Sequence, residues 1–175
     1  MTERSDRYME TYTGIRFHPI DPRPEDIVLE DIAHALSQVN RYNGHTIYPY
    51  SVAQHCCLLH DAIPEHKDKA LFHDGSEAYI CDVPSPLKPF LSNYKEIEAR
   101  VQNIIYEKYT GSSNEPDIVK EYDRRILVNE KAALFPKTIN YWLEFGPALD
   151  VKIEMWEPKR AEAEFYKRGI QYIKR

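Results

Sequence analysis

Residues 70–88 read ALFHDGSEAYICDVPSPLK, a stretch that places a histidine and three carboxylates beside an apolar run. The apolar residues recur at spacings of one, three and four, which predicts a helix with one buried face. Asp74 falls on that face, where an unpaired carboxylate would be costly. At about 100° per residue, His73 and Glu77 lie within roughly the same third of the helix. We therefore predict an inward polar wedge of His73, Asp74 and Glu77.

Two prolines predict where this helix ends. Pro84 and Pro86 disfavour helical geometry in the residues before them and cannot donate a backbone hydrogen bond, so the helix should stop near Val83. Asp82 and Lys88 then lie on the loop that leaves the polar wedge. This loop therefore carries both a carboxylate and a cation.

The composition is that of a soluble protein with one domain. The chain has 175 residues, of which 42% are hydrophobic and 29% charged, and a chain of this length buries about two-thirds of its unfolded surface. Its formal net charge of −5 argues against a general binder of nucleic acid or membrane surfaces. No apolar run approaches the ~18 residues of a membrane span, and the opening MTERSDRY lacks the apolar centre of a signal peptide. The three cysteines, two of them adjacent, fit reduced thiols, so we expect a cytoplasmic protein.

The remaining pattern predicts a mainly α protein. Ile15 and Phe17 predict a short strand, and the alternation of Val151, Ile153 and Met155 predicts a second strand that could pair with it. We therefore predict a helical bundle with a small two-stranded ribbon formed by the N- and C-terminal flanks. From caps, prolines and apolar stripes, helices are predicted at about residues 25–39, 51–63, 93–109, 117–135 and from 158 onward.

Two of these helices each carry an inward polar residue. His55 shares one face of its predicted helix with apolar residues, and Asp123 lies on the apolar face of the helix predicted at 117–135. Taken singly, His55 fits a hydrogen-bonded core histidine, and Asp123 fits a salt bridge to a neighbouring arginine. A second His-Asp dipeptide, His60-Asp61, is rotated by about 140° from His55 and is predicted to be exposed.

Several inward polar sites in one small core are unlikely to be independent. Two imidazoles and two carboxylates form a mixed nitrogen and oxygen set that suits Mn, Fe, Co, Ni or Zn, and a divalent ion would neutralise the buried carboxylates. Four protein ligands leave positions for water and substrate if the metal is five- or six-coordinate. A structural zinc site would more typically use cysteines, and no thiol here has ligand spacing. The predicted ligands are His55, His73, Asp74 and Asp123.

The order of these four ligands, H…HD…D, resembles the HD-domain metal-dependent phosphohydrolases. Within that superfamily the chain is similar to bacterial 5′-deoxynucleotidases and to phage-encoded dATP triphosphohydrolases. The similarity is strong over about residues 29–135 and looser in the flanks, and it implies a single HD domain over residues 1–175. The motifs that carry it are YSVAQH at 50–55, HDGSEAYICDVPSPLK at 73–88 and VKEYD at 119–123.

The resemblance also implies catalytic roles. It assigns the four predicted ligands to the metal, and it makes Glu77 and Asp74 the catalytic residues. Glu77 would position or deprotonate the attacking water. Asp82 would contact the sugar or, together with Glu77, bind a second ion such as Mg or Co.

Five positions match substrate contacts of the resembled enzymes. Arg41, Lys88 and Lys120 correspond to residues that meet phosphate oxygens, and Tyr42 corresponds to an aromatic residue beside the nucleoside. Gly44 stands where some phage dATP enzymes carry a bulky apolar residue that shapes an adenine pocket. Because this side chain is missing here, strict selectivity for adenine is not expected.

The expected function is metal-dependent hydrolysis of 2′-deoxynucleoside 5′-phosphates, either as a dATP or dNTP triphosphohydrolase or as a dNMP 5′-nucleotidase. Purine deoxynucleotides such as dATP and dAMP should be favoured by stacking on Tyr42. The alternatives are a catalytically silent HD protein that binds nucleotide or metal as a regulator, and a cyclic-nucleotide phosphodiesterase. Glu77 and Asp82 weigh against a silent protein, because a binding module has no use for a water-handling carboxylate. The resemblance further implies a homo-oligomer without nucleic-acid or membrane partners, in the host cytoplasm if phage-encoded.

Overall fold

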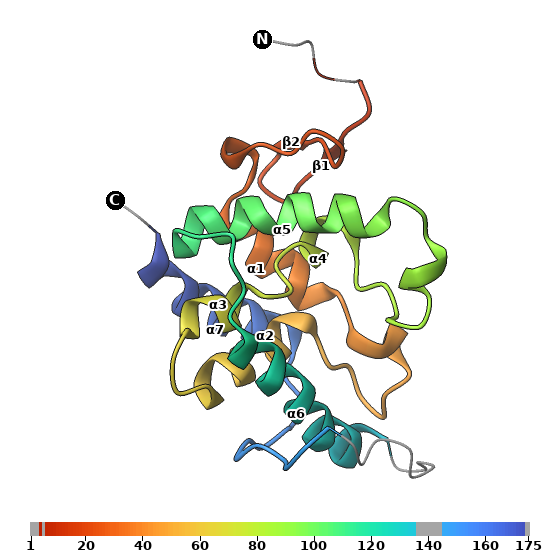
Figure 1. Cartoon of the computed structure of the whole chain (residues 1–175), viewed down its shortest axis with the longest axis vertical. Coiled ribbons are helices and arrows are strands. Elements are labelled where there is room, and N and C mark those ends of the chain that lie inside the picture. Colours follow the sequence, from red (N-terminus) through yellow and green to blue (C-terminus); the bar gives the residue numbers. More distant parts are fainter. Residues whose placement is uncertain (1–3, 5, 136–144, 174–175) are drawn as a thin grey trace.

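The computed structural model describes residue 4 and residues 6–135 and 145–173, and helices make up most of it (Figure 1). The predicted mainly α class is therefore confirmed. No helix among the described residues is long and apolar enough to cross a membrane. The helices are α1 (Leu29–Gln38), α2 (Val52–Ala62), α3 (Lys67–Phe72), α4 (Glu77–Ile80), α5 (Tyr94–Thr110), α6 (Asp117–Leu134) and α7 (Pro158–Gly169), with short 3₁₀ turns at Pro24–Asp26, Arg41–Gly44, Lys88–Phe90 and Ile170–Tyr172.

A small ribbon lies at one end of the molecule, above α5 in Figure 1. Its strands are β1 (Met9–Glu10) and β2 (Arg16–Phe17), which pair antiparallel. Gly14, with a φ of 83°, closes the turn by donating its N–H to the carbonyl of Thr11 at 2.9 Å. A small ribbon was predicted and is confirmed, and both of its strands come from the N-terminal flank.

The predicted second strand at residues 151–155 is not part of that ribbon, so its predicted pairing was wrong. Side chains of two helices bind the backbone of this region instead. Gln54 of α2 donates to the carbonyl of Glu154 at 2.6 Å, and Asn129 of α6 donates to the carbonyls of Leu149 and Val151 at 2.9 and 3.3 Å. These backbone carbonyls therefore have hydrogen-bond donors without forming a sheet.

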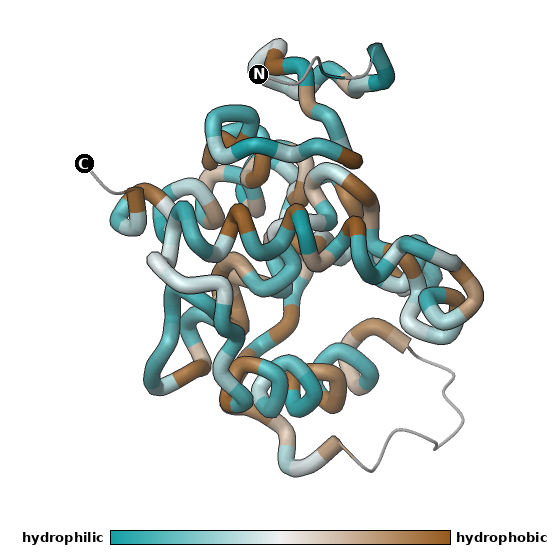
Figure 2. Tube along the Cα trace, turned by 45° about the horizontal axis from the view of Figure 1, so that its top comes forward, coloured by the Kyte–Doolittle hydropathy of each residue, from teal (hydrophilic) through white to brown (hydrophobic). Residues whose placement is uncertain are grey.

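The buried apolar residues form two clusters. The larger one lies among α1, α2, α3, α5 and α7 and includes Ile32, Phe72 and Phe165. The smaller one lies beneath α6 and contains Leu59, Ile63, Ala70, Val119, Ile126 and Leu149. Figure 2 shows hydrophobic and hydrophilic segments alternating along the helices, as expected where each helix buries one side.

The predicted helix over residues 70–83 is interrupted at the polar wedge. It is divided into α3 and α4 by a turn over residues 73–76, and α4 ends at Ile80. Gln102 of α5 explains the break, because its side chain accepts the N–H of Ser76 at 2.9 Å and donates to the carbonyl of Phe72 at 2.7 Å. A Cβ added to Gly75 would lie 3.0 Å from the Ile105 side chain, so glycine also lets the turn approach α5 closely.

Gly169 permits a close approach between α7 and α1, which pack against each other. An added Cβ would lie 2.6 Å from Cδ1 of Leu29, whose side chain is 4% exposed. We expect Gly169→Ala to lower the free energy of unfolding by up to about 2 kcal/mol. Overpacking costs about 1–3 kcal/mol, and the better helix propensity of alanine offsets about 1 kcal/mol of this. Chemical denaturation measures the difference.

The matched control for this prediction is the double variant Leu29→Ala/Gly169→Ala. Removing the Leu29 side chain makes room for the new methyl group, so the Gly169 substitution should no longer destabilise on that background. Equal destabilisation with and without Leu29 would contradict the packing explanation.

Candidate metal centre and its pocket

The four predicted ligands meet at one point, although they come from three separate parts of the chain. His55 lies on α2, His73 and Asp74 on the turn between α3 and α4, and Asp123 on α6. His55 Nε2 is 3.1 Å from both His73 Nε2 and Asp123 Oδ1. Asp74 Oδ2 is 3.2 Å from His73 Nε2 and 3.8 Å from His55 Nε2. The fold therefore gathers two imidazoles and two carboxylates into one cluster.

Hydrogen bonds fix the orientation of both imidazoles. Nδ1 of His55 donates to Oε1 of Glu130 at 2.6 Å, and Nδ1 of His73 donates to the carbonyl of Ala70 at 2.8 Å. With both Nδ1 atoms acting as donors, the two Nε2 atoms face each other as lone pairs unless a cation or a proton lies between them. This is the arrangement that metal-binding histidines adopt.

The cluster fits a divalent ion. His55, His73 and Asp123 could together hold a metal, since their ligand atoms all lie within 4.8 Å of one another. Ligands bound at about 2.0–2.2 Å to a shared ion lie roughly 3 Å apart, as several of these atoms do. Oδ1 of Asp123 is buried and has no hydrogen-bond partner, although His55 Nε2 is 3.1 Å away. This geometry is expected where the Asp123 oxygen and the His55 nitrogen both point at an ion between them.

A second possible group combines Cys56, His73 and Asp74. Sγ of Cys56 lies 3.9 Å from Nδ1 of His73, but this nitrogen already donates to the carbonyl of Ala70. Burial also raises the pKa of the Cys56 thiol, which disfavours the thiolate that a metal requires. The histidine and aspartate cluster is therefore the better metal site.

The electrostatic environment shifts the pKa values of the three carboxylates of the site in different directions. Burial raises the pKa of Asp74, but His73 and Arg41 outweigh it and hold that pKa below its ordinary value. The pKa of Asp123 is likewise lowered, because His55 and His73 outweigh its burial. The pKa of Glu77 is raised well above its ordinary value by burial and then by Asp74 and Asp82. Asp74 and Asp123 thus stay ionised, as metal binding would require, while Glu77 holds a proton more readily.

A pocket of about 630 Å³ adjoins the cluster. Glu77 lies in its wall with only 5% of its surface exposed, and its Oε2 is buried without a hydrogen-bond partner. Such a group can exchange a proton with a small molecule in the pocket. The predicted site residues that line this pocket are Arg41, Tyr42, Asp74, Glu77, Asp82, Lys88 and Asp123, and the other lining residues are Asn43, Pro84, Ser85, Pro86, Leu127 and Phe145.

The loop after α4 contributes Asp82 and Lys88, as its sequence indicated. Burial is the main cause that raises the pKa of Asp82. Lys88 Nζ donates to Oε1 of Glu98 on α5 at 2.7 Å. Burial lowers the pKa of Lys88, but the hydrogen bond to Glu98 and the negative charges of Glu98, Glu77 and Asp74 together outweigh it, so the pKa is raised and the ammonium keeps its charge. The pocket thus has a cation held in place from α5.

Arg41 and Tyr42 face the pocket, and both also contact carboxylates below it. Arg41 is 3.2 Å from Oδ2 of Asp74 and 3.5 Å from Oε2 of Glu130. The Tyr42 hydroxyl donates to Glu130, and its ring packs edge-on against Phe135 with centroids 5.1 Å apart. Their predicted contacts with substrate remain predictions, and the structure adds a second role in supporting the metal cluster.

Two predicted substrate residues do not line this pocket. Gly44 is exposed at a φ of +73°, and a Cβ added to it would meet nothing within 4 Å. Lys120 points to solvent with 57% of its side chain exposed, and its nearest carboxylate is Glu115 at 3.5 Å. Lys120 precedes Asp123 by three residues, about one helical turn, and its side chain extends toward Glu115 and Asp117 rather than into the pocket. Their predicted substrate contacts stay predictions, and neither residue is among those that line the pocket.

The second His-Asp dipeptide differs from its prediction at His60, whereas Asp61 is exposed as predicted. His60 was predicted to be exposed, but it is 7% exposed because the C-terminal segment covers it. Its ring nitrogens lie 2.8 Å from Asp61 Oδ1 and 3.2 Å from the hydroxyl of Tyr172. Asp61 in turn accepts from Arg168 of α7 at 2.7 Å. This dipeptide joins α7 to α2 and takes no part in the metal cluster.

Sequence reasoning missed Glu130, whose carboxylate is fully buried beside His55. A signal for it exists, because Glu130 follows Asp123 by seven residues and therefore lies on the same face of α6 two turns later. Glu98, which binds Lys88, was also missed. It lies on a half-buried part of α5 with no pattern that distinguishes it from an ordinary surface glutamate.

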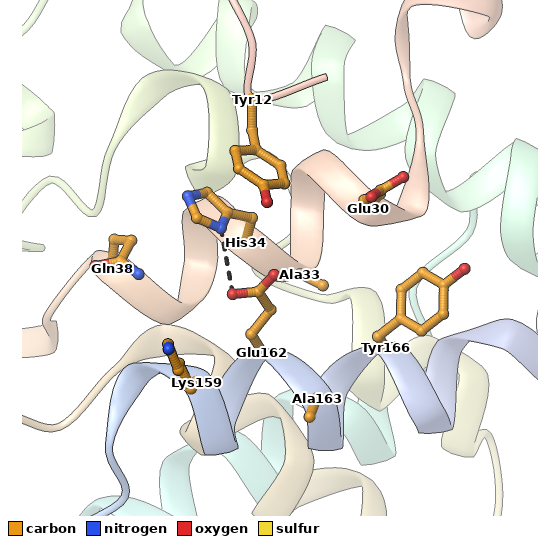
Figure 3. Close-up of a pocket in the computed structure, with 9 residues that line it drawn as sticks. All are labelled: Tyr12, Glu30, Ala33, His34, Gln38, Lys159, Glu162, Ala163 and Tyr166. Carbon is orange, nitrogen blue, oxygen red and sulfur yellow. Dashed lines mark hydrogen bonds and ion pairs between the residues drawn. The ribbon is translucent and has the colours of Figure 1, made fainter.

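A second pocket, of about 700 Å³, lies between α1 and α7 (Figure 3). There the Tyr12 ring stacks on His34 with centroids 3.7 Å apart, and Nδ1 of His34 lies 3.2 Å from Glu162. Figure 3 shows Ala33 and Glu162 pointing into the space between the two helices. No set of three metal-binding atoms is found there among the described residues. The possible metal cluster adjoins the pocket beside His55 instead.

Fold and site together define a mainly helical protein with a buried histidine and aspartate cluster that could hold a metal ion. The chain is 37% identical over 147 residues to the uncharacterized protein YfdR of Escherichia coli (strain K12), a match that covers 82% of this chain and 83% of YfdR. The chain therefore belongs to the YfdR family. It is also 35% identical over 108 residues to the uncharacterized protein RCAP_rcc00048 of Rhodobacter capsulatus, covering 55% of each chain. No family model matches the chain.

Proposed function

We propose that this protein is a metal-dependent phosphohydrolase of 2′-deoxynucleoside 5′-phosphates, of the HD-domain type. The observation that carries the proposal is the convergence of His55, His73, Asp74 and Asp123 beside a pocket that also contains Glu77. A purely structural cluster would need neither an adjoining pocket nor an unpartnered carboxylate in its wall. A hydrolase needs both.

The nature of the donors indicates which ions fit. Imidazole nitrogen together with carboxylate oxygen suits Mn, Fe, Co, Ni or Zn, whereas Ca and Mg prefer oxygen alone. Glu77 and Asp82 both line the pocket and offer oxygen ligands for a second ion such as Mg or Co. When bound, a divalent ion lowers the pKa of its water and offsets the charge of a phosphoryl group.

The side chains of this chain supply the remaining chemistry. Glu77, with a raised pKa and an unpartnered Oε2, orients the attacking water and moves its proton. Arg41 and Lys88 offset negative charge on the phosphate and on the leaving group. Tyr42 lines the pocket, and stacking of a base on its ring would favour purine deoxynucleotides such as dATP and dAMP.

We expect the purified protein, supplied with Co²⁺ or Mn²⁺, to hydrolyse deoxynucleotides in preference to ribonucleotides. The experiment is chromatography of products from a panel of mono-, di- and triphosphates, deoxy and ribo, together with cyclic nucleotides. Inorganic phosphate from monophosphates alone would identify a 5′-nucleotidase. Intact triphosphate released from dATP would identify a triphosphohydrolase. The control is the same panel with Asp123→Asn, which removes one ligand from the cluster.

Two outcomes of the panel favour other functions. Hydrolysis confined to cyclic nucleotides would indicate a phosphodiesterase. If no compound is hydrolysed with any metal while nucleotide still binds, the protein is better explained as a nucleotide-binding regulator.

A further inference from the structure

Glu130 connects the metal cluster to the wall of the pocket. Its carboxylate is fully buried near the end of α6, and both of its oxygens are engaged. Oε1 accepts from Nδ1 of His55 at 2.6 Å and from the hydroxyl of Tyr50 at 2.9 Å. Oε2 accepts from the hydroxyl of Tyr42 and lies 3.5 Å from the guanidinium of Arg41. One side chain thus contacts a metal ligand and two pocket residues.

On the metal side, Glu130 sets the tautomer of His55. A carboxylate accepts only, so the Nδ1 that it binds must carry the hydrogen, and the lone pair is left on Nε2 facing Asp123 and His73. Because the acceptor is charged, this bond is stronger than the one that His73 makes to a backbone carbonyl. Partners of this kind also make the imidazole a better metal ligand.

On the pocket side, Glu130 holds a strained turn. Tyr42 and Asn43 have φ angles of 56° and 51°, in a region that residues other than glycine seldom adopt. Two such residues in succession persist only where their surroundings hold them, and such strain concentrates at ligand-binding positions. Both residues line the pocket, and the hydroxyl of Tyr42 reaches down to Oε2 of Glu130.

We propose that Glu130 is a positioning residue that serves both halves of the site. One carboxylate oxygen fixes the metal-facing tautomer of His55, and the other holds the turn that presents Arg41 and Tyr42 to the substrate. The substrate half of this inference rests on the proposed function, whereas the metal half does not. Metal affinity and substrate recognition are then linked through a single side chain.

The first test is titration of the metal-free protein with Co²⁺, followed by the visible absorption of the bound ion. Glu130→Gln should bind Co²⁺ about 10–100-fold more weakly than the wild type, with an altered cobalt spectrum. Tyr42→Phe removes the hydroxyl that contacts Oε2 and leaves the bond between Oε1 and His55 in place, so it should retain the wild-type cobalt affinity. Wild-type affinity and spectrum in Glu130→Gln would overturn the metal half of the proposal.

The matched control is Glu115→Gln. Glu115 also accepts a hydrogen bond from a tyrosine, Tyr106, at 2.9 Å, but it lies outside the pocket. Its cobalt affinity should equal that of the wild type. Circular dichroism and thermal melting of the metal-free proteins establish that each variant is folded. If Glu130→Gln does not fold, Glu130→Asp provides the same comparison, because it keeps the charge but shortens its reach to His55.

The second test is kinetic and uses the preferred deoxynucleotide from the product panel. Tyr42→Phe should raise KM several-fold with a smaller change in kcat, whereas Glu130→Gln should affect both. An unchanged KM in Tyr42→Phe would overturn the pocket half. Failure of the proposed function is recognised separately, because a wild-type protein that binds Co²⁺ but hydrolyses no compound leaves the cobalt comparison intact.

Discussion

Glu77→Gln is expected to lower kcat by about 10²–10⁴-fold while the protein keeps its metal ion, because general acid–base groups contribute effects of this size. Glu77 lies in the wall of the pocket and contributes no atom to the two possible metal groups found among the described residues. Glutamine keeps the shape of the side chain but cannot carry the proton. The measurements are kcat on the preferred deoxynucleotide and metal content by elemental analysis.

The control for this prediction is again Glu115→Gln, a glutamate bound to a tyrosine outside the pocket. It should keep both the turnover and the metal of the wild type. If Glu77→Gln turns over as fast as the wild type, Glu77 has a structural role and the attacking water is activated by the metal alone. If the variant loses its metal as well, Glu77 is a ligand rather than a proton carrier.

His55→Ala and Asp123→Ala are each expected to weaken metal binding by more than about 100-fold, beyond the effect of removing an outer partner. Each change removes one of the converging atoms from the cluster. The measurements are retained metal after dialysis and titration with Co²⁺. Metal should also stabilise the wild type against heat, by about 2.7 kcal/mol at 100 times its dissociation constant, and this stabilisation should be lost in both variants.

A matched control for these changes is His60→Ala. His60 is another buried histidine of α2 beside an aspartate, but it contacts Asp61 and Tyr172 rather than the cluster. This variant should melt at a lower temperature and still bind metal as the wild type does. Full metal occupancy in both His55→Ala and Asp123→Ala would remove the basis of the metal site.

Much of the fold could be predicted because local signals decide it. Ser51 caps α2 by accepting the N–H of Gln54, and Gly111 ends α5 in a left-handed conformation, which are roles that serine and glycine favour. The break before α4 could not be predicted, because it depends on Gln102 from a different helix. The predicted pairing of residues 151–155 with the N-terminal strand was wrong for a similar reason. Side chains of α2 and α6 bind the backbone of this segment instead.

The clustering of the four predicted ligands could be predicted because a helical period places each of them facing inward, and His73 and Asp74 still face the cluster although they lie on a turn. Periodicity alone places such residues inside, and their chemical types indicate a metal. The absence of Lys120 from the pocket lining could not be predicted in this way, because the position of a long exposed side chain depends on its rotamer and on nearby carboxylates such as Glu115. Glu130 was within reach of the same periodicity argument, two turns after Asp123 on α6.

The smaller hydrophobic cluster has a consequence for how the molecule opens. α6 lies on this separate cluster, away from the larger core that α1, α5 and α7 share. It also carries Asp123, whose Oδ1 lies 3.1 Å from Nε2 of His55 on α2, and Glu130, which accepts from Nδ1 of the same histidine. A bound ion would therefore add a second connection between α6 and α2, beside the smaller apolar cluster to which both helices contribute. Detachment of α6 and release of the metal would then be a single event, so the occupied site would suppress this local unfolding.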